Sequence, residues 1–218
     1  MDGEKQVIER TANYIRGQFE GEGSGHDWWH IHRVWKNSIS IGEKEGGDMF
    51  VVQLGALLHD IDDFKLHGGD SSVGAREARK YLKSLGVNED VVNHVCEIVG
   101  DISFKGAGEE KPMRTLEGRI VRDADRLDAM GAIGIARCFA YGGYKGTPIH
   151  LPDVKPKLHE TTEEYITRQS SQINHFYEKL LLLKELMLTD TGKKMAEGRH
   201  RYMLEYLEQF DKEWDGEV

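Results

Sequence analysis

The dipeptide His59–Asp60 directly follows an apolar run, a position that suits metal chemistry. The run is MFVVQLGALL, residues 49–58. A carboxylate at the end of such a segment loses hydration, which is costly unless a cation or hydrogen-bond donors compensate. A divalent metal does so, and imidazole with carboxylate suits Mn, Fe, Co, Ni or Zn better than Ca. The alternative is a histidine at a helix end beside a solvated aspartate, and the dipeptide alone leaves both interpretations open.

Two further segments offer ligands of the same chemistry. His30 lies one helical turn after Asp27, which is placed to cap that helix, and the adjacent apolar stripe allows His30 to point inward. Asp125 and Asp128 are three residues apart in RDADRLDA and share one helix face. The alternatives are a hydrogen-bonded core histidine and a solvated acidic face paired with nearby arginines. A cation shared with His59–Asp60 would offset both the burial and the mutual repulsion of these carboxylates.

Helices are the elements that must position these residues. Apolar residues recur at three- and four-residue steps along the chain, and no segment alternates convincingly at period two, so the pattern predicts an all-α fold. A length of 218 residues is compatible with one domain. We expect helices near residues 7–15, 28–41, 49–58, 72–86, 89–98, 116–140, 161–187 and 190–214. The segment 116–140 is expected to be one helix, irregular near Arg122, and Asn88 and Gly86 are expected at helix ends.

Taken in order, the three candidate segments resemble the signature of the HD-domain phosphohydrolase superfamily. DWWHIHRVW, LLHDIDDFK and RDADRLDA supply a His, a His–Asp pair and a later Asp, each on a separate predicted helix. The resemblance implies one HD-type helical domain over 1–218, with a metal-binding core at about 26–140 and C-terminal helices at about 161–214 packed on it. Carried over by position, the implied metal ligands are His30, His59, Asp60 and Asp125.

The same resemblance implies a cofactor and a reaction. We expect one divalent ion, Mn, with Mg, Fe, Co, Ni and Zn as alternatives, because beyond His94 the further histidines of two-metal members are not found. The segments ISFKG and INHFYEKLL are similar to a small bacterial subgroup, some of whose members convert nucleoside triphosphates to monophosphate and pyrophosphate. A metal-bound hydroxide would attack phosphorus. The alternatives are a phosphomonoesterase or cyclic-nucleotide phosphodiesterase with the same ligands, and a non-catalytic metal-containing nucleotide sensor.

Other polar residues are assigned supporting roles. Asp63, just past the His–Asp pair, could orient a metal-bound water. The residues assigned to phosphate binding are Arg33, Lys65 and Lys179, the last from a polar stripe with Arg168, Gln172 and His175. Asp27 and Asp128 are expected to support the ligands without binding the ion. A solvated surface charge is the alternative for Asp63 and each of the cations. Trp28, Trp29 and Trp35 are expected in the core, with nucleobase stacking as their alternative.

Composition limits the partners. With 38 acidic and 29 basic residues the formal charge is −9, which disfavours long nucleic acid and anionic membranes. A small phosphorylated substrate, in particular a nucleotide, remains compatible because a bound cation supplies positive charge locally. Without an apolar stretch of membrane-spanning length or a signal-type h-region, we expect a cytoplasmic protein, either monomer or homodimer. Cys96 and Cys138 are expected to be buried free thiols.

Overall fold

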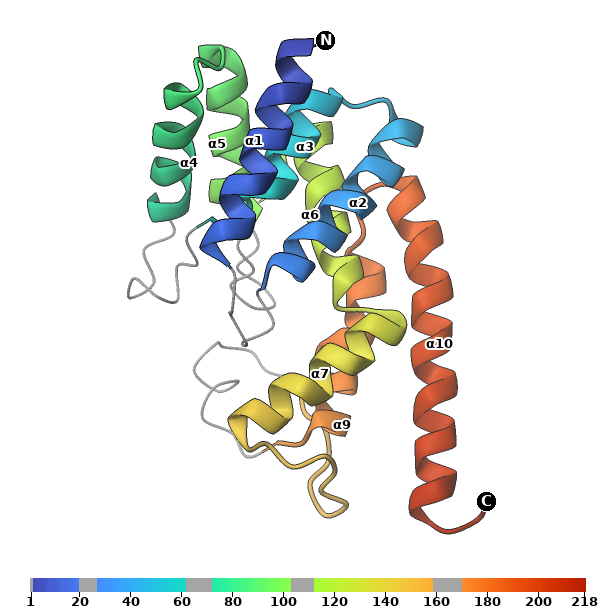
Figure 1. The fold of residues 1–218 in the computed structure, drawn as a ribbon. Coiled ribbons are helices and arrows are strands. Elements are labelled where there is room, and N and C mark those ends of the chain that lie inside the picture. Colours follow the sequence, from blue (N-terminus) through green and yellow to red (C-terminus); the bar gives the residue numbers. More distant parts are fainter. Residues whose placement is uncertain (1, 20–26, 62–71, 103–111, 159–169) are drawn as a thin grey trace. The chain divides into compact units, whose positions relative to one another are not determined.

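In the computed structural model, residues 2–19, 27–61, 72–102, 112–158 and 170–218 are described, and every regular element within them is a helix (Figure 1). The predicted all-α class is therefore confirmed. The chain forms two compact units, one comprising residues 1–105 and 109–124 and the other residues 106–108 and 125–218. The single HD-type domain stays a prediction. No helix in the described ranges has the length and apolarity required to cross a membrane.

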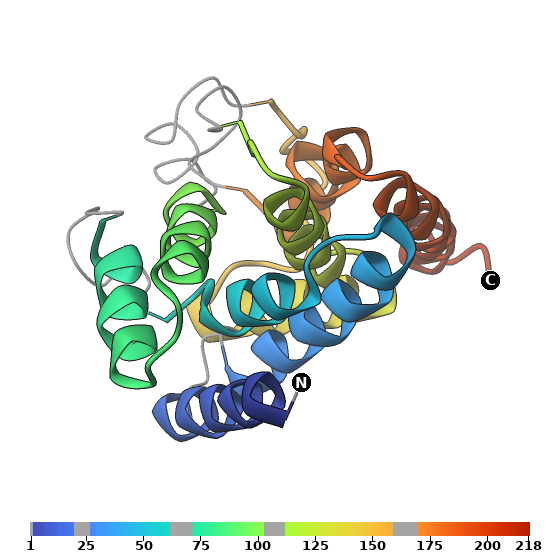
Figure 2. The ribbon, with the colours of Figure 1, turned by 90° about the horizontal axis from the view of Figure 1, so that it is seen from above.

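The first unit is organised around a central apolar helix. Its elements are α1 (Asp2–Gln18), α2 (Trp28–Glu45), α3 (Met49–Leu58), α4 (Ser72–Ser84), α5 (Glu89–Ile102) and the first part of α6 (Leu116–Asp128). Helix α3 packs against α1, α2 and α5, and Figure 2 shows it between α2 and α5. Gln53 is the one residue between Val51 and Leu58 that is not buried. Helix α3 is therefore apolar on nearly every face, because neighbouring helices surround it.

Three residues predicted at helix ends in this unit are confirmed there: Asp27, Gly86 and Asn88. Asp27 caps α2 and accepts a hydrogen bond from the backbone N–H of His30 at 2.9 Å. Asp48 caps α3, and Asn88 caps the start of α5. Gly86 follows α4 at φ +72°, a conformation that costs glycine little and other residues more. These caps satisfy backbone groups that a helix end leaves without partners, and so fix where each helix begins or ends.

The second unit contains the helices of the C-terminal half. They are α7 (Gly131–Lys145), α9 (Gln172–Glu178), the 3-10 helix η2 (Leu180–Leu186) and α10 (Asp190–Trp214). Helix α10 packs on α7 and η2, and α9 contacts both α7 and η2. Helices α7 and α9 approach closely at Gly142, where an added Cβ would lie 2.5 Å from Cδ of Gln172 and would displace that side chain. Cys138 is buried here, and Cys96 is buried in the first unit; both are free thiols, as predicted.

The helix predicted for residues 116–140 is interrupted, and the interruption is not at Arg122. Helix α6 is regular through Arg122 and ends at Asp128, and α7 begins at Gly131. Met130 is extended, with φ −124° and ψ 160°, and Gly131 has φ +67°. The prediction of one continuous helix was wrong because glycine can adopt the left-handed conformation that separates two helical segments.

The helix predicted for residues 161–187 also differs from the structure. Residues 159–169 lie outside the described ranges, and in the remainder α9 ends before Lys179, whose φ of −145° and ψ of −58° are not helical. A 3-10 helix follows, in which Leu180 and Leu183 are buried. Their three-residue spacing matches the three residues per turn of a 3-10 helix. The tighter winding of this helix therefore places Leu180 and Leu183 on its buried face, whereas Leu182 is exposed.

Candidate metal centre

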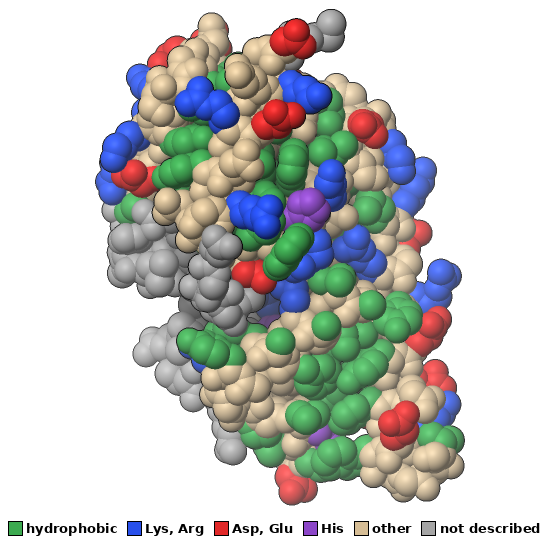
Figure 3. All heavy atoms as spheres, viewed as in Figure 1, with side chains coloured by type: hydrophobic (Ala, Val, Ile, Leu, Met, Phe, Trp, Pro, Cys, Tyr) green, Lys and Arg blue, Asp and Glu red, His purple; other side chains and the backbone are tan. Residues whose placement is uncertain are grey.

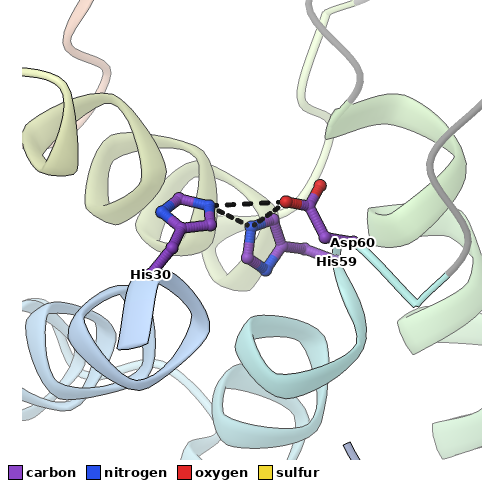
Figure 4. A group of neighbouring side chains, drawn as sticks. All are labelled: His30, His59 and Asp60. Atoms are coloured by element: carbon purple, nitrogen blue, oxygen red, sulfur yellow. Dashed lines mark hydrogen bonds and ion pairs between the residues drawn. The ribbon is translucent and has the colours of Figure 1, made fainter. Parts of the chain in front are cut away.

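Three side chains of the first unit converge with ligand atoms facing one another: His30 from α2, and His59 and Asp60 directly after α3 (Figure 4). Nε2 of His30 lies 3.2 Å from Nε2 of His59. Oδ2 of Asp60 lies 3.4 Å from the former and 3.5 Å from the latter. Ligands bound tetrahedrally at about 2.1 Å are separated by roughly 3.4 Å, so the three atoms already have the spacing that one ion requires.

The donor set of this trio fits a divalent transition metal. His30 is 1% exposed and His59 is 6% exposed, so neither ring is solvated. Nδ1 of His59 lies 2.8 Å from the carbonyl oxygen of Ala56, an acceptor, and must therefore donate. That hydrogen bond leaves the Nε2 lone pair of His59 directed at the other two ligand atoms. Two imidazoles and one carboxylate suit Mn, Fe, Co, Ni or Zn better than Ca.

The trio is positioned by the ends of two helices. His59 is the C-cap residue of α3, and the Ile61 N–H bonds to the carbonyl of Leu58 at 3.1 Å, which forms a turn around the His–Asp pair. A helix C-terminus carries partial negative charge and favours a cation. The Asp60 side chain is 20% exposed, whereas the two imidazoles are buried. The carboxylate is therefore the solvent-accessible member of the group.

The remaining predicted site residues are distributed as follows. Asp125 lies on α6 but belongs to the second unit, so its role as fourth ligand stays a prediction. Asp63 and Lys65 fall outside the described residues. Arg33 is half-buried on α2, and Lys179 is half-buried after α9. Among the described residues, no second group of three or more potential ligands meets the same spacing as the trio.

Asp128 has a partner that sequence reasoning missed. It is fully buried, and its Oδ2 lies 2.8 Å from Nη1 of Arg137 on α7. Two arginines of α6 also donate to backbone carbonyls: Arg122 to Asp101 and Arg126 to Leu186. The interruption before α7 is what lets Arg137, nine residues along the chain, reach Asp128. A role in supporting the metal ligands stays a prediction.

His94, considered as a further metal ligand, is paired with a carboxylate instead. Its Nε2 lies 3.5 Å from Oε2 of Glu117. Oε1 of Glu117 accepts the backbone N–H of Asp48 at 2.9 Å, which ties the start of α3 to α6. Sequence reasoning missed Glu117, because a glutamate in the first turn of a helix is ordinary.

His175 is a titratable group whose protonation the fold disfavours. Desolvation, and secondarily the charge of Lys179, lower the pKa of His175 from 6.5 to about 4. As pH falls from 6.5 to 4, His175 becomes protonated in the unfolded chain but stays neutral in the folded chain. Protonation therefore favours the unfolded state, and His175 should reduce stability over this pH range. We expect His175→Gln to show a smaller loss of unfolding free energy between pH 7 and pH 4.5 than the wild type. Urea unfolding at both pH values measures this, and equal losses would contradict it.

Comparisons with known proteins place this geometry in context. The HD domain family model matches residues 28–130. YpgQ of Bacillus subtilis strain 168, an uncharacterised protein, is 36% identical over 98% of this chain and 96% of its own length. A crystal structure of an HD-superfamily hydrolase from Bacillus thuringiensis is 42% identical with a TM-score of 0.77, covering 98% of this chain and 99% of that one. The structure of Bacillus subtilis YpgQ in complex with ADP has 38% identity and a TM-score of 0.74, covering 94% and 98%.

Proposed function

The chain belongs to the HD superfamily, and from this premise we propose that it is a metal-dependent phosphohydrolase acting on small phosphorylated molecules, specifically nucleotides. The observation that carries the proposal is the buried trio of His30, His59 and Asp60, with ligand atoms 3.2–3.5 Å apart. His59 and Asp60 lie at the C-terminal end of α3, where the partial negative charge favours a cation. Together with His30 they supply three ligand atoms for one ion.

In this proposal Asp125 is the fourth ligand, supported by the resemblance of RDADRLDA to the family signature. Two carboxylates and two neutral imidazoles then balance the charge of one divalent ion, for which we propose Mn. When bound, such an ion supplies Lewis-acid activation of water and of a phosphoryl oxygen. The chain holds the ligands through the Asp27 cap on the helix of His30 and through the Ala56 carbonyl on His59.

The proposed substrate contacts are three cations and one carboxylate assigned from the sequence. Arg33, Lys65 and Lys179 would offset the charge of the phosphates, and Asp63 would orient the attacking water. Asp128 would support the helix end that follows Asp125. A relative that is 38% identical has been crystallised with ADP, which supports a nucleotide as the substrate class for this chain. We propose hydrolysis of a nucleoside triphosphate to monophosphate and pyrophosphate.

The test is to strip the protein of metal, restore Mn, Mg, Ni or Zn singly, and resolve the products from a panel of nucleotides. We expect no turnover in the stripped protein, recovery with Mn, and pyrophosphate released from triphosphates. Orthophosphate from monophosphates, or monophosphate from cyclic nucleotides, would indicate the phosphomonoesterase or phosphodiesterase instead. Tight nucleotide binding without turnover in any metal would indicate a sensor, and unchanged turnover after stripping would rule out metal dependence.

A further inference from the structure

A side-chain hydrogen bond joins the two helices that carry the trio. Nε1 of Trp35, on α2, donates to Oε1 of Gln53, on α3, at 3.1 Å. Nε2 of Gln53 donates to the carbonyl oxygen of Met49 at 3.1 Å, so both ends of the amide are bonded. Trp35 is five residues after His30, and Gln53 is six residues before His59. At 1.5 Å per residue, the bond lies about 8–9 Å along each helix from its histidine.

Gln53 is unusual within its helix. It is the one polar residue in MFVVQLGALL, where all the others are apolar or glycine. Apolar packing tolerates small shifts better than a directional hydrogen bond does. A metal site needs its ligands placed to within about 0.5 Å. The Trp35–Gln53 bond is therefore well placed to fix the register between the two helices.

The Trp35 ring has two further contacts, both with residues of its own helix. Trp35 is half-buried, with His32 packed edge-on at 6.2 Å between ring centroids and Lys36 at 5.2 Å over the ring. Trp29, which lies six residues earlier on α2, is 57% exposed, so the core location predicted from sequence was wrong for Trp29. Figure 3 shows hydrophobic, basic and histidine side chains together at the surface over α2.

An open groove borders the same ring. It has a volume of about 450 Å³ and lies between α1, α2 and α3, with Trp35, Gln53, Ile39 and Phe50 among its lining residues. The indole therefore borders open space on the groove side, and its hydrogen bond to Gln53 is a directional contact that links it to α3.

We propose that Trp35 and Gln53 are positioning residues of the metal centre: their hydrogen bond sets the register of α2 against α3 and thereby the spacing of the His30 and His59 imidazoles. The inference rests on the proposed metal-binding function. Neither residue touches the ion; both act through the helices that carry its ligands.

The test measures Mn²⁺ affinity of the full chain by isothermal titration, and ligand geometry by the absorption spectrum of the Co²⁺-loaded protein. Gln53→Met and Trp35→Phe should each raise the Kd for Mn²⁺ by about three- to tenfold and shift the Co²⁺ bands, which is the range of indirect coupling effects. The double variant should be little worse than either single variant, because both remove the same bond. Gln53→Glu keeps the acceptor for Trp35 and should bind Mn²⁺ nearly as the wild type does.

Tyr81→Leu is the matched control. The Tyr81 ring on α4 stacks on Tyr14 of α1, with 4.2 Å between ring centroids, and neither helix carries a ligand of the trio. We expect this variant to lower Tm while leaving the Kd for Mn²⁺ and the Co²⁺ spectrum unchanged. If Gln53→Met lowers Tm but keeps the wild-type Kd and spectrum, the positioning role is overturned. If the wild type itself binds no Mn²⁺ or Co²⁺, the proposed function fails first, and the inference fails with it.

Discussion

Asp60→Ala should lose its bound metal and its phosphohydrolase turnover together. Oδ2 of Asp60 lies within 3.5 Å of both imidazole Nε2 atoms, so the variant removes one ligand and the negative charge nearest the proposed ion. His30, His59 and the proposed ligand Asp125 would remain, with one carboxylate charge instead of two to balance the divalent ion, so we expect the ion to be lost to solvent. Metal content by elemental analysis and nucleotide turnover should both fall to background.

The matched control is Asp190→Ala. Asp190 lies in the first turn of α10, its side chain is 85% exposed, and its ion pair is with Lys193. This variant also removes one carboxylate but should keep metal content and turnover at the wild-type level. Far-UV circular dichroism should show both variants folded. Full turnover in a folded Asp60→Ala protein would end the account of the site.

Asp128→Ala should destabilise the protein strongly. The carboxylate is fully buried and lies 2.8 Å from the Arg137 guanidinium. Its charge also favours the protonated form of Arg199, whose pKa burial lowers. Removing one partner of a buried pair leaves uncompensated charge, which typically costs about 3–5 kcal/mol. We expect a loss of about 3 kcal/mol in the free energy of unfolding in urea.

Two further variants show whether this loss comes from the buried pair. Arg137→Met in the Asp128→Ala background should recover part of the loss, because it removes the charge that was left unpaired. Glu77→Ala breaks an exposed pair with Lys80 and should change stability by about 0.5 kcal/mol or less. An Asp128→Ala protein as stable as the wild type would mean that the carboxylate is not needed to neutralise its neighbours.

Sequence could predict those parts of the site that are signalled by residues close together in the chain. His59–Asp60 stood out because a charged dipeptide ends an apolar helix, and His30 because one turn separates it from a capping aspartate. The caps Asp27 and Asn88 could be predicted because a cap bonds to backbone only a few residues away. The trio is thus predictable from two short segments, given that they fold as helices.

The parts that sequence could not predict depend on tertiary contacts. Gly131 is one glycine in an otherwise continuous helical pattern, and only the structure shows that it adopts a positive φ. The pairing of Asp128 with Arg137 follows from that interruption. The bond between Trp35 and Gln53 joins residues 18 positions apart, and no local signal links them. Trp29 is exposed although tryptophan at helical spacing is usually buried.

Anomalous diffraction from crystals grown with Mn²⁺ tests the central claim most directly. The account predicts one manganese peak within about 2.3 Å of Nε2 of His30, Nε2 of His59 and a carboxylate oxygen of Asp60, with Asp125 completing the protein ligands. A manganese peak elsewhere, with these imidazoles and the Asp60 carboxylate unbound, would contradict it.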